Sequence, residues 1–126
     1  MSHDSLLKGL ILILLICTLS ACAQPKPLYV YGDYSETYYR QVKTDNEENR
    51  LKLTASMEKA IAEADQSRTG RVPPGMYANL GYLYLKAGNP QKALSNFEQE
   101  KATYPEASHF MDRIIAKVKL AEGEEK

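Results

Sequence analysis

The fold of this chain is best predicted from residues 76–105, MYANLGYLYLKAGNPQKALSNFEQEKATYP. Apolar side chains recur there at three- and four-residue steps, which is the spacing of one face of an α-helix. The pattern stops at Gly88 and resumes after Asn89 and Pro90. That pair is a typical helix start, with asparagine as the N-cap and proline at the first helical position. These residues therefore predict two helices joined by a short turn.

The two helices resemble the tetratricopeptide repeat (TPR), a pair of antiparallel helices of about 34 residues. Its pattern has an aromatic residue, leucine-glycine and tyrosine on the first helix, then alanine, an aromatic residue and a closing proline on the second. Small residues are needed where the helices cross, and large aromatic residues fill the space around the crossing. The resemblance implies that the packing residues are Tyr77, Leu80, Gly81, Tyr84, Ala93, Phe97 and Pro105.

Glu100 departs from this pattern, because the repeat usually has a small residue late in its second helix. A carboxylate near a helix interface must find a partner or reach the rim of the interface. We expect Glu100 to reach the surface or to pair with a nearby base. The alternative is that it binds a cation or a backbone amide of a partner protein.

Other helices must cover this pair, because one repeat cannot bury its own hydrophobic faces. A short helix is expected to start at Ser35, a second covers about 46–64, and a last one over about 106–120 acts as a C-terminal cap. No segment has the alternating pattern of a strand. The sequence therefore predicts an all-α, TPR-like domain of about five helices over residues 35–121, with a polar tail at 122–126.

The N-terminus has the pattern of a bacterial lipoprotein precursor. Residues 10–19 (LILILLICTL) form an apolar run shorter than the roughly 20 residues that span a membrane, which is typical of a signal peptide. Leu-Ser-Ala-Cys follows at 19–22, and this is the sequence of a lipoprotein processing site. We expect residues 1–21 to be removed by cleavage between Ala21 and Cys22. The alternative is an ordinary secretory signal with a cysteine there by chance.

Cys22 would then carry a diacylglycerol on its sulfur and a further acyl chain, such as palmitate, on its amine. Stable anchoring needs more than one acyl chain, and this number is sufficient. Ala23 follows, whereas in enterobacteria-like sorting an aspartate at that position retains a lipoprotein in the inner membrane. The expected location is therefore the outer membrane, facing the periplasm, and the inner membrane is the less favoured alternative. Residues 22–34 form the lipidated tether and a tyrosine-rich segment.

The composition argues against catalysis and against nucleic-acid binding. Sixteen Lys and Arg balance sixteen Asp and Glu. After cleavage the chain would keep one histidine, His109, and no free thiol, whereas zinc sites draw on Cys, His and carboxylates at close spacing. No nucleophile elbow or phosphate-binding glycine loop is present in the sequence. We therefore expect no enzyme activity, no metal and no cofactor.

Two parts of the chain contain candidate binding residues. TPR domains generally present a groove lined by their first helices, and the resemblance places Gln41, Asn79, Tyr82 and Lys86 on that face. Tyr82 lies out of phase with the core-facing residues, and exposed tyrosine is a common interface anchor.

The tyrosine-rich segment 28–39 (LYVYGDYSETYY) is the second part. Tyr29, Tyr31 and Tyr34 either dock on a partner, stack on sugars of peptidoglycan or lipopolysaccharide, or pack back onto the helices. We favour the packing.

Three segments together resemble a family of short, functionally uncharacterised bacterial lipoproteins with a TPR-like domain. They are LYVYGDY at 28–34, VPPGMYANLG at 72–81, and the motifs EK, YPE and FMDR within 100–113. Tyr31 stands where that family commonly has tryptophan. Its members are often encoded beside a curli-export-channel (CsgG-like) lipoprotein, which implies an envelope partner of that kind. The expected function is a membrane-anchored protein-interaction scaffold; the alternative is a glycan- or peptidoglycan-binding module that uses the tyrosine-rich segment.

Overall fold

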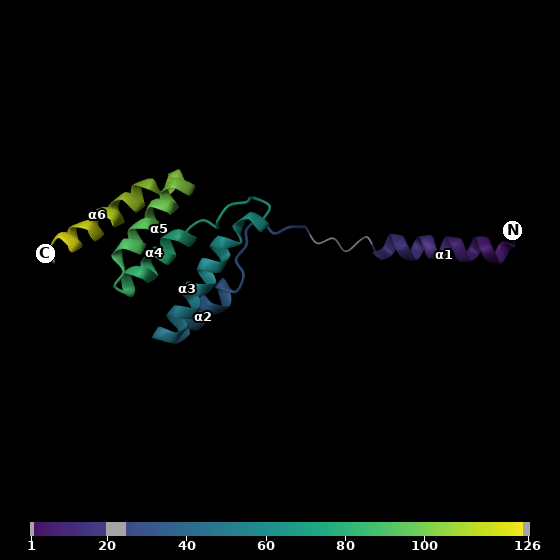
Figure 1. The fold of residues 1–126 in the computed structure, drawn as a ribbon, viewed down its shortest axis with the longest axis horizontal. Coiled ribbons are helices and arrows are strands. Elements are labelled where there is room, and N and C mark those ends of the chain that lie inside the picture. Colours follow the sequence, from purple (N-terminus) through teal and green to yellow (C-terminus); the bar gives the residue numbers. More distant parts are fainter. Residues whose placement is uncertain (1, 20–24, 125–126) are drawn as a thin grey trace.

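The structure, a computed structural model, describes residues 2–19 and 25–124, and within these ranges it is all-α, without strands (Figure 1). Its helices are α1 (His3–Leu19), α2 (Tyr34–Lys43), α3 (Glu47–Ala62), α4 (Met76–Lys86), α5 (Pro90–Thr103) and α6 (Ser108–Glu124). Two short 3-10 helices are η2 (Ala64–Gln66) and η3 (Pro105–Ala107). The prediction of an all-α fold, with five helices after the segment expected to be the signal peptide, is confirmed.

The expected signal peptide is helical as α1, and its apolar side chains from Leu6 to Ile13 are exposed. Among the described residues, no helix has the length and hydropathy needed to cross a membrane. The predicted cleavage and lipidation residues, Ala21 and Cys22, lie outside the described residues. The lipid anchor therefore stays a prediction.

Asparagine caps fix the starts of α3 and α5. The Asn46 side chain accepts a hydrogen bond from the Asn49 backbone N–H at 2.8 Å, and Asn89 accepts one from the Lys92 N–H at 3.1 Å. Each cap satisfies one of the N–H groups that the first helical turn leaves free. Helix α5 ends at Thr103, before the proline that was expected to end it.

The start of α2 and the end of α6 differ from the positions expected from the sequence. Helix α2 begins one residue earlier than Ser35, with Asp33 at the N-cap after a turn at Gly32, whose φ is 50°. Helix α6 continues to Glu124, so residues 122–124 are not a separate polar tail. The Gln91 side-chain amide donates to the Glu122 carboxylate at 2.6 Å, which holds this last turn of α6 against the start of α5.

The helices pack as two hairpins, α2 with α3 and α4 with α5, and α6 covers α5 (Figure 1). One buried group joins α3 to α4 and consists of Leu53, Met57, Ala60, Ala64, Val72, Met76, Leu80 and Leu83. A second joins α5 to α6 and consists of Ala93, Phe97, Met111, Ile115 and Val118. Half-buried Tyr84 packs against both groups, so the domain has a continuous core.

Gly81 lies where α4 and α5 are in closest contact. A Cβ there would lie 2.6 and 2.9 Å from two ring carbons of Phe97 and 3.1 Å from the Ala93 carbonyl oxygen. The small residues that the sequence pattern requires therefore allow the two helices to approach.

We expect Gly81→Leu to lower the free energy of unfolding by about 1–3 kcal/mol, because overpacking forces the two helices apart. Gly123→Leu is the matched control, since a Cβ at Gly123 in α6 meets nothing within 4 Å. Urea unfolding followed by circular dichroism measures both variants. Equal stability of the two would contradict the close contact at Gly81.

Two tyrosine hydroxyls join segments that are distant in the sequence. The Tyr84 hydroxyl on α4 donates to the Glu58 carboxylate on α3, and burial together with this bond raises the pKa of Tyr84 from 10.0 to about 12. The Tyr104 hydroxyl donates to the Val72 carbonyl at 2.6 Å, and burial raises the pKa of Tyr104 to about 12 as well.

Alkaline pH should therefore destabilise the domain. Both pKa values are higher in the folded chain than in the unfolded one, so the stability that they contribute is complete below pH 10 and is lost as pH rises through about 12. Urea unfolding at a series of pH values should show a steeper loss for the native chain than for Tyr84→Phe with Tyr104→Phe. If the free energy of unfolding fell with pH equally in the native chain and in the double variant, deprotonation of these two hydroxyls would not affect stability.

Candidate binding groove

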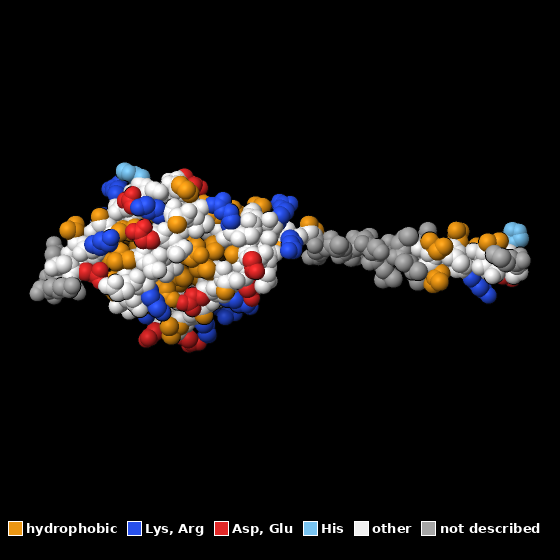
Figure 2. Space-filling view, turned by 45° about the horizontal axis from the view of Figure 1, so that its top comes forward, with side chains coloured by type: hydrophobic (Ala, Val, Ile, Leu, Met, Phe, Trp, Pro, Cys, Tyr) orange, Lys and Arg blue, Asp and Glu red, His pale blue; other side chains and the backbone are white. Residues whose placement is uncertain are grey.

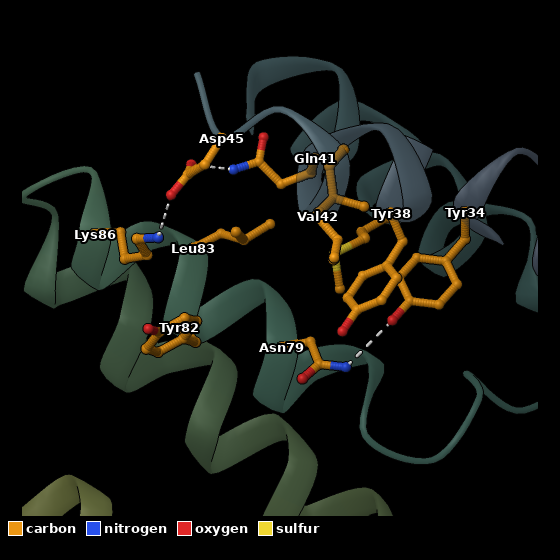
Figure 3. A pocket seen from close by; sticks show the side chains of 11 residues that line it. Tyr34, Tyr38, Gln41, Val42, Asp45, Asn79, Tyr82, Leu83 and Lys86 are labelled. Carbon is orange, nitrogen blue, oxygen red and sulfur yellow. Dashed lines mark hydrogen bonds and ion pairs between the residues drawn. The ribbon is translucent and has the colours of Figure 1, made fainter. Parts of the chain in front are cut away.

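A groove of about 350 Å³ lies between α2 and α4, with α3 forming its floor (Figure 3). Residues from four parts of the chain line it: Tyr34, Tyr38, Gln41 and Val42 of α2, Asp45 of the following turn, Leu53 and Met57 of α3, and Asn79, Tyr82, Leu83 and Lys86 of α4. The groove forms because α2 and α4 are both packed against α3 but have few contacts with each other. Most of its exposed lining surface is apolar.

Polar side chains connect α2 to α4 at both ends of the groove (Figure 3). At one end the Gln41 amide donates to Asp45, and Lys86 Nζ lies 3.5 Å from the other Asp45 carboxylate oxygen. At the other end Asn79 Nδ2 lies 3.4 Å from the Tyr34 hydroxyl oxygen. Because Asp45 and Lys86 balance each other and the other lining residues are neutral, the groove has no formal net charge.

Gln41 is the most buried polar residue of the groove, with 8% of its surface exposed. Its amide nitrogen must face Asp45, because a carboxylate only accepts hydrogen bonds. The amide oxygen is left buried without a partner among the described residues.

Tyr82 stands between this groove and a second hollow. The residue is 58% exposed, and Lys86 Nζ lies 5.9 Å from its ring centroid, within the range of a cation–π contact. Tyr82 and Asn79 also line a hollow of about 220 Å³ together with Phe110 and Ile114 of α6. The two hollows form one surface across α2, α4 and α6.

The structure brings together the four residues that the TPR resemblance placed on one face. Gln41, Asn79, Tyr82 and Lys86 all line the groove, and Gln41 is buried rather than exposed. Sequence reasoning missed Tyr38, Val42, Asp45 and Leu83. Tyr38 could have been found, because it lies four residues after Tyr34 and three before Gln41, on the same face of α2.

The tyrosine-rich segment lies on the domain. The Pro27 carbonyl accepts a hydrogen bond from the Arg68 N–H at 2.8 Å, and the Leu28 carbonyl accepts one from the Thr69 hydroxyl at 2.9 Å. The rings of Tyr29, Tyr31, Tyr34 and Tyr38 follow one another with centroid distances of 6.4, 6.3 and 5.7 Å. Tyr34 also packs against the buried α3–α4 group. The backbone of the segment and the Tyr34 side chain are thus packed on the domain, whereas Tyr31 stays 44% exposed.

Glu100 is not at the surface and forms no ion pair with a basic side chain of the described residues, so that expectation was wrong. It is 3% exposed, and its carboxylate accepts hydrogen bonds from the backbone N–H groups of Gly75 at 2.7 Å and Ala78 at 3.3 Å. These amides belong to the start of α4, where free N–H groups and the helix dipole favour a negative charge. Glu100 therefore joins α5 to α4 and does not face an external partner.

Within residues 2–19 and 25–124, no cluster of three or more His, Cys, Asp or Glu side chains could hold a metal ion.

A family model described as a domain of unknown function (DUF4810) matches residues 28–114, a range that contains every residue of the groove between α2 and α4. No curated protein and no solved structure shows a significant match to the chain. Because the matched range covers more than half of its length, the chain belongs to the DUF4810 family.

Proposed function

We propose that this protein is a membrane-anchored lipoprotein whose TPR-like domain binds another envelope protein through the groove between α2 and α4. The main support for the proposal is that one apolar groove is lined from both sides. Helix α2 contributes Tyr38 and Gln41, and α4 contributes Asn79, Tyr82 and Lys86. Exposed aromatic side chains beside an apolar hollow are typical anchors of protein interfaces.

The anchor in this proposal is Cys22. An apolar segment too short to span a membrane precedes Leu-Ser-Ala-Cys at 19–22, and Ala23 favours export to the outer membrane over retention in the inner one. The domain would face the periplasm.

The TPR-like assignment is supported by the α4–α5 hairpin. Gly81 lies against Phe97 and Ala93, as the crossing of a TPR requires, and Tyr77, Leu80 and Tyr84 pack on the α3–α4 core. Helix α6 would be the capping helix, and α2 with α3 a degenerate preceding repeat.

The chemistry of the groove favours a protein segment with apolar side chains. Tyr38, Val42 and Tyr82 line the groove and are exposed, so they offer apolar contacts. The balanced pair Asp45–Lys86 leaves no net charge to attract a strongly acidic or basic ligand. The resemblance to lipoproteins encoded beside CsgG-like lipoproteins makes a CsgG-like protein our first candidate for the partner.

Site-specific photo-crosslinking in intact envelopes tests this proposal. A photoreactive residue at Tyr82 should give one defined adduct with an envelope protein, because this side chain stands between the two hollows. The matched control is Gln99, an exposed position on α5 outside the groove, which should give none. The same adducts from both positions, or none from Tyr82, would contradict the assigned surface.

The alternative function is a glycan- or peptidoglycan-binding module, and the row of close rings from Tyr29 to Tyr38 favours it. Sedimentation with isolated peptidoglycan sacculi separates the two functions. A protein-binding scaffold should stay in the supernatant, and Tyr31→Ala should change nothing. Sedimentation of the native chain that Tyr31→Ala abolishes would favour the glycan-binding function.

A further inference from the structure

The described part of the tether enters the domain beside the loop that joins α3 to α4. The hydrogen bonds of Pro27 and Leu28 with Arg68 and Thr69 fix this entry point. Cys22 is five residues before Pro27, and five extended residues reach at most about 18 Å. If Cys22 carries the lipid anchor, this end of the domain must stay close to the leaflet.

This end of the domain presents basic and apolar side chains together. Lys26, Arg68 and Arg71 are exposed, while Leu28 is 50% and Tyr31 44% exposed. Figure 2 shows Lys and Arg side chains at the end of the domain beside the grey residues. Asp65 is the one acidic residue in 64–71, and none lies in 25–31, so the two segments together are positively charged.

Arg71 is held in place on this surface. Its guanidinium lies 4.6 Å from the ring centroid of Tyr104 and donates to the Thr103 carbonyl, yet the residue stays exposed. The basic side chains of the surface therefore come from the tether and from the α3–α4 loop, and the hydrogen bonds between these two segments keep them together.

We propose that this surface, made of Lys26, Leu28, Tyr31, Arg68 and Arg71, binds the anionic headgroups of the phospholipid leaflet. The proposal rests on the lipid anchor of the proposed function. Each basic side chain near an anionic membrane surface raises the binding constant for that surface about fivefold. Tyrosine side chains are enriched in the headgroup region. The anchor keeps the surface at high local concentration, so weak contacts are sufficient to orient the domain.

The orientation has a consequence for the groove. Helix α4 is eleven residues long, which carries the chain about 16 Å from the tether end to the turn at Ala87. The end of the groove at Asp45 and Lys86 then points away from the leaflet, toward a partner in the periplasm.

Fluorescence quenching on reconstituted vesicles tests this surface. The full-length gene product, extracted from cell membranes, carries a single introduced thiol at exposed Gln66→Cys or, as the control, at Ala87→Cys. Each is labelled with a fluorophore and reconstituted in phosphatidylcholine vesicles with or without phosphatidylglycerol, doped with a quencher in the headgroup region. Phosphatidylglycerol should increase the quenching at position 66 severalfold and leave position 87 unchanged.

Charge variants complete the test. Lys26→Gln with Arg68→Gln should abolish the phosphatidylglycerol-dependent quenching, whereas Lys43→Gln with Lys119→Gln, the same charge change at exposed positions elsewhere, should preserve it. If the protein is bound to the vesicles but the quenching at position 66 is the same with and without phosphatidylglycerol, the headgroup contact is overturned and the lipid anchor is not. Protein that does not float with the vesicles, and whose cysteines at 17 and 22 react with the fluorophore, would overturn the lipid anchor and this inference with it.

Discussion

Cys22→Ser is expected to abolish acylation and cleavage together, and the variant should accumulate as a full-length precursor. The thiolate is the nucleophile that takes the diacylglycerol, and a serine hydroxyl is far less nucleophilic at neutral pH. Palmitate labelling and electrophoretic mobility measure the two effects.

Cys17→Ser is the matched control, because Cys17 lies in the segment that cleavage removes. That variant should be labelled and cleaved like the native chain. Normal palmitate labelling of Cys22→Ser would show that the fatty acid is attached elsewhere and would contradict Cys22 as the anchor.

Glu100→Ala should have the largest effect on stability, a loss on the order of 3 kcal/mol. The substitution removes a buried carboxylate and leaves the N–H groups of Gly75 and Ala78 without their acceptor. Hydrogen bonds to a charged group contribute about 1.5–3 kcal/mol, and a buried donor left unsatisfied adds its own desolvation penalty. Urea unfolding followed by circular dichroism measures the loss.

Two further variants separate the causes. Glu100→Gln keeps the size of the side chain and one acceptor but loses the charge, so its loss of stability should lie between those of the native chain and Glu100→Ala. Glu98→Ala removes an exposed carboxylate of the same helix, 4.0 Å from Lys101, and should cost less than about 1 kcal/mol. If Glu100→Ala were as stable as Glu98→Ala, the carboxylate would not join α5 to α4.

Local signals predicted most of the fold. The starts of α3 and α5 follow from Asn46 and Asn89, because an N-cap depends on neighbouring residues only. The close approach at Gly81 follows from the spacing of small and aromatic residues, which the repeat pattern records.

The misses involve contacts between distant parts of the chain. Glu100 meets an amide 25 residues away, and no periodicity along α5 could show that the start of α4 would surround it with free N–H groups. Asp45 joins the groove through Lys86, 41 residues later, and a turn residue shows no such pairing in its own surroundings. The groove therefore could not be predicted without the three-dimensional arrangement of α2 and α4. Its central residue Tyr82 could be predicted, because it lies out of phase with the core-facing residues of its helix.

The central claim is that a lipid on Cys22 holds this helical domain at a membrane. Mass spectrometry of the N-terminal peptide, from protein extracted from the membranes of cells that express the whole chain, tests it most directly. The account predicts a peptide that begins at Cys22 and carries a diacylglycerol and an amide-linked fatty acid. A peptide that begins elsewhere, or an unmodified Cys22 in protein recovered from the aqueous fraction, would contradict it.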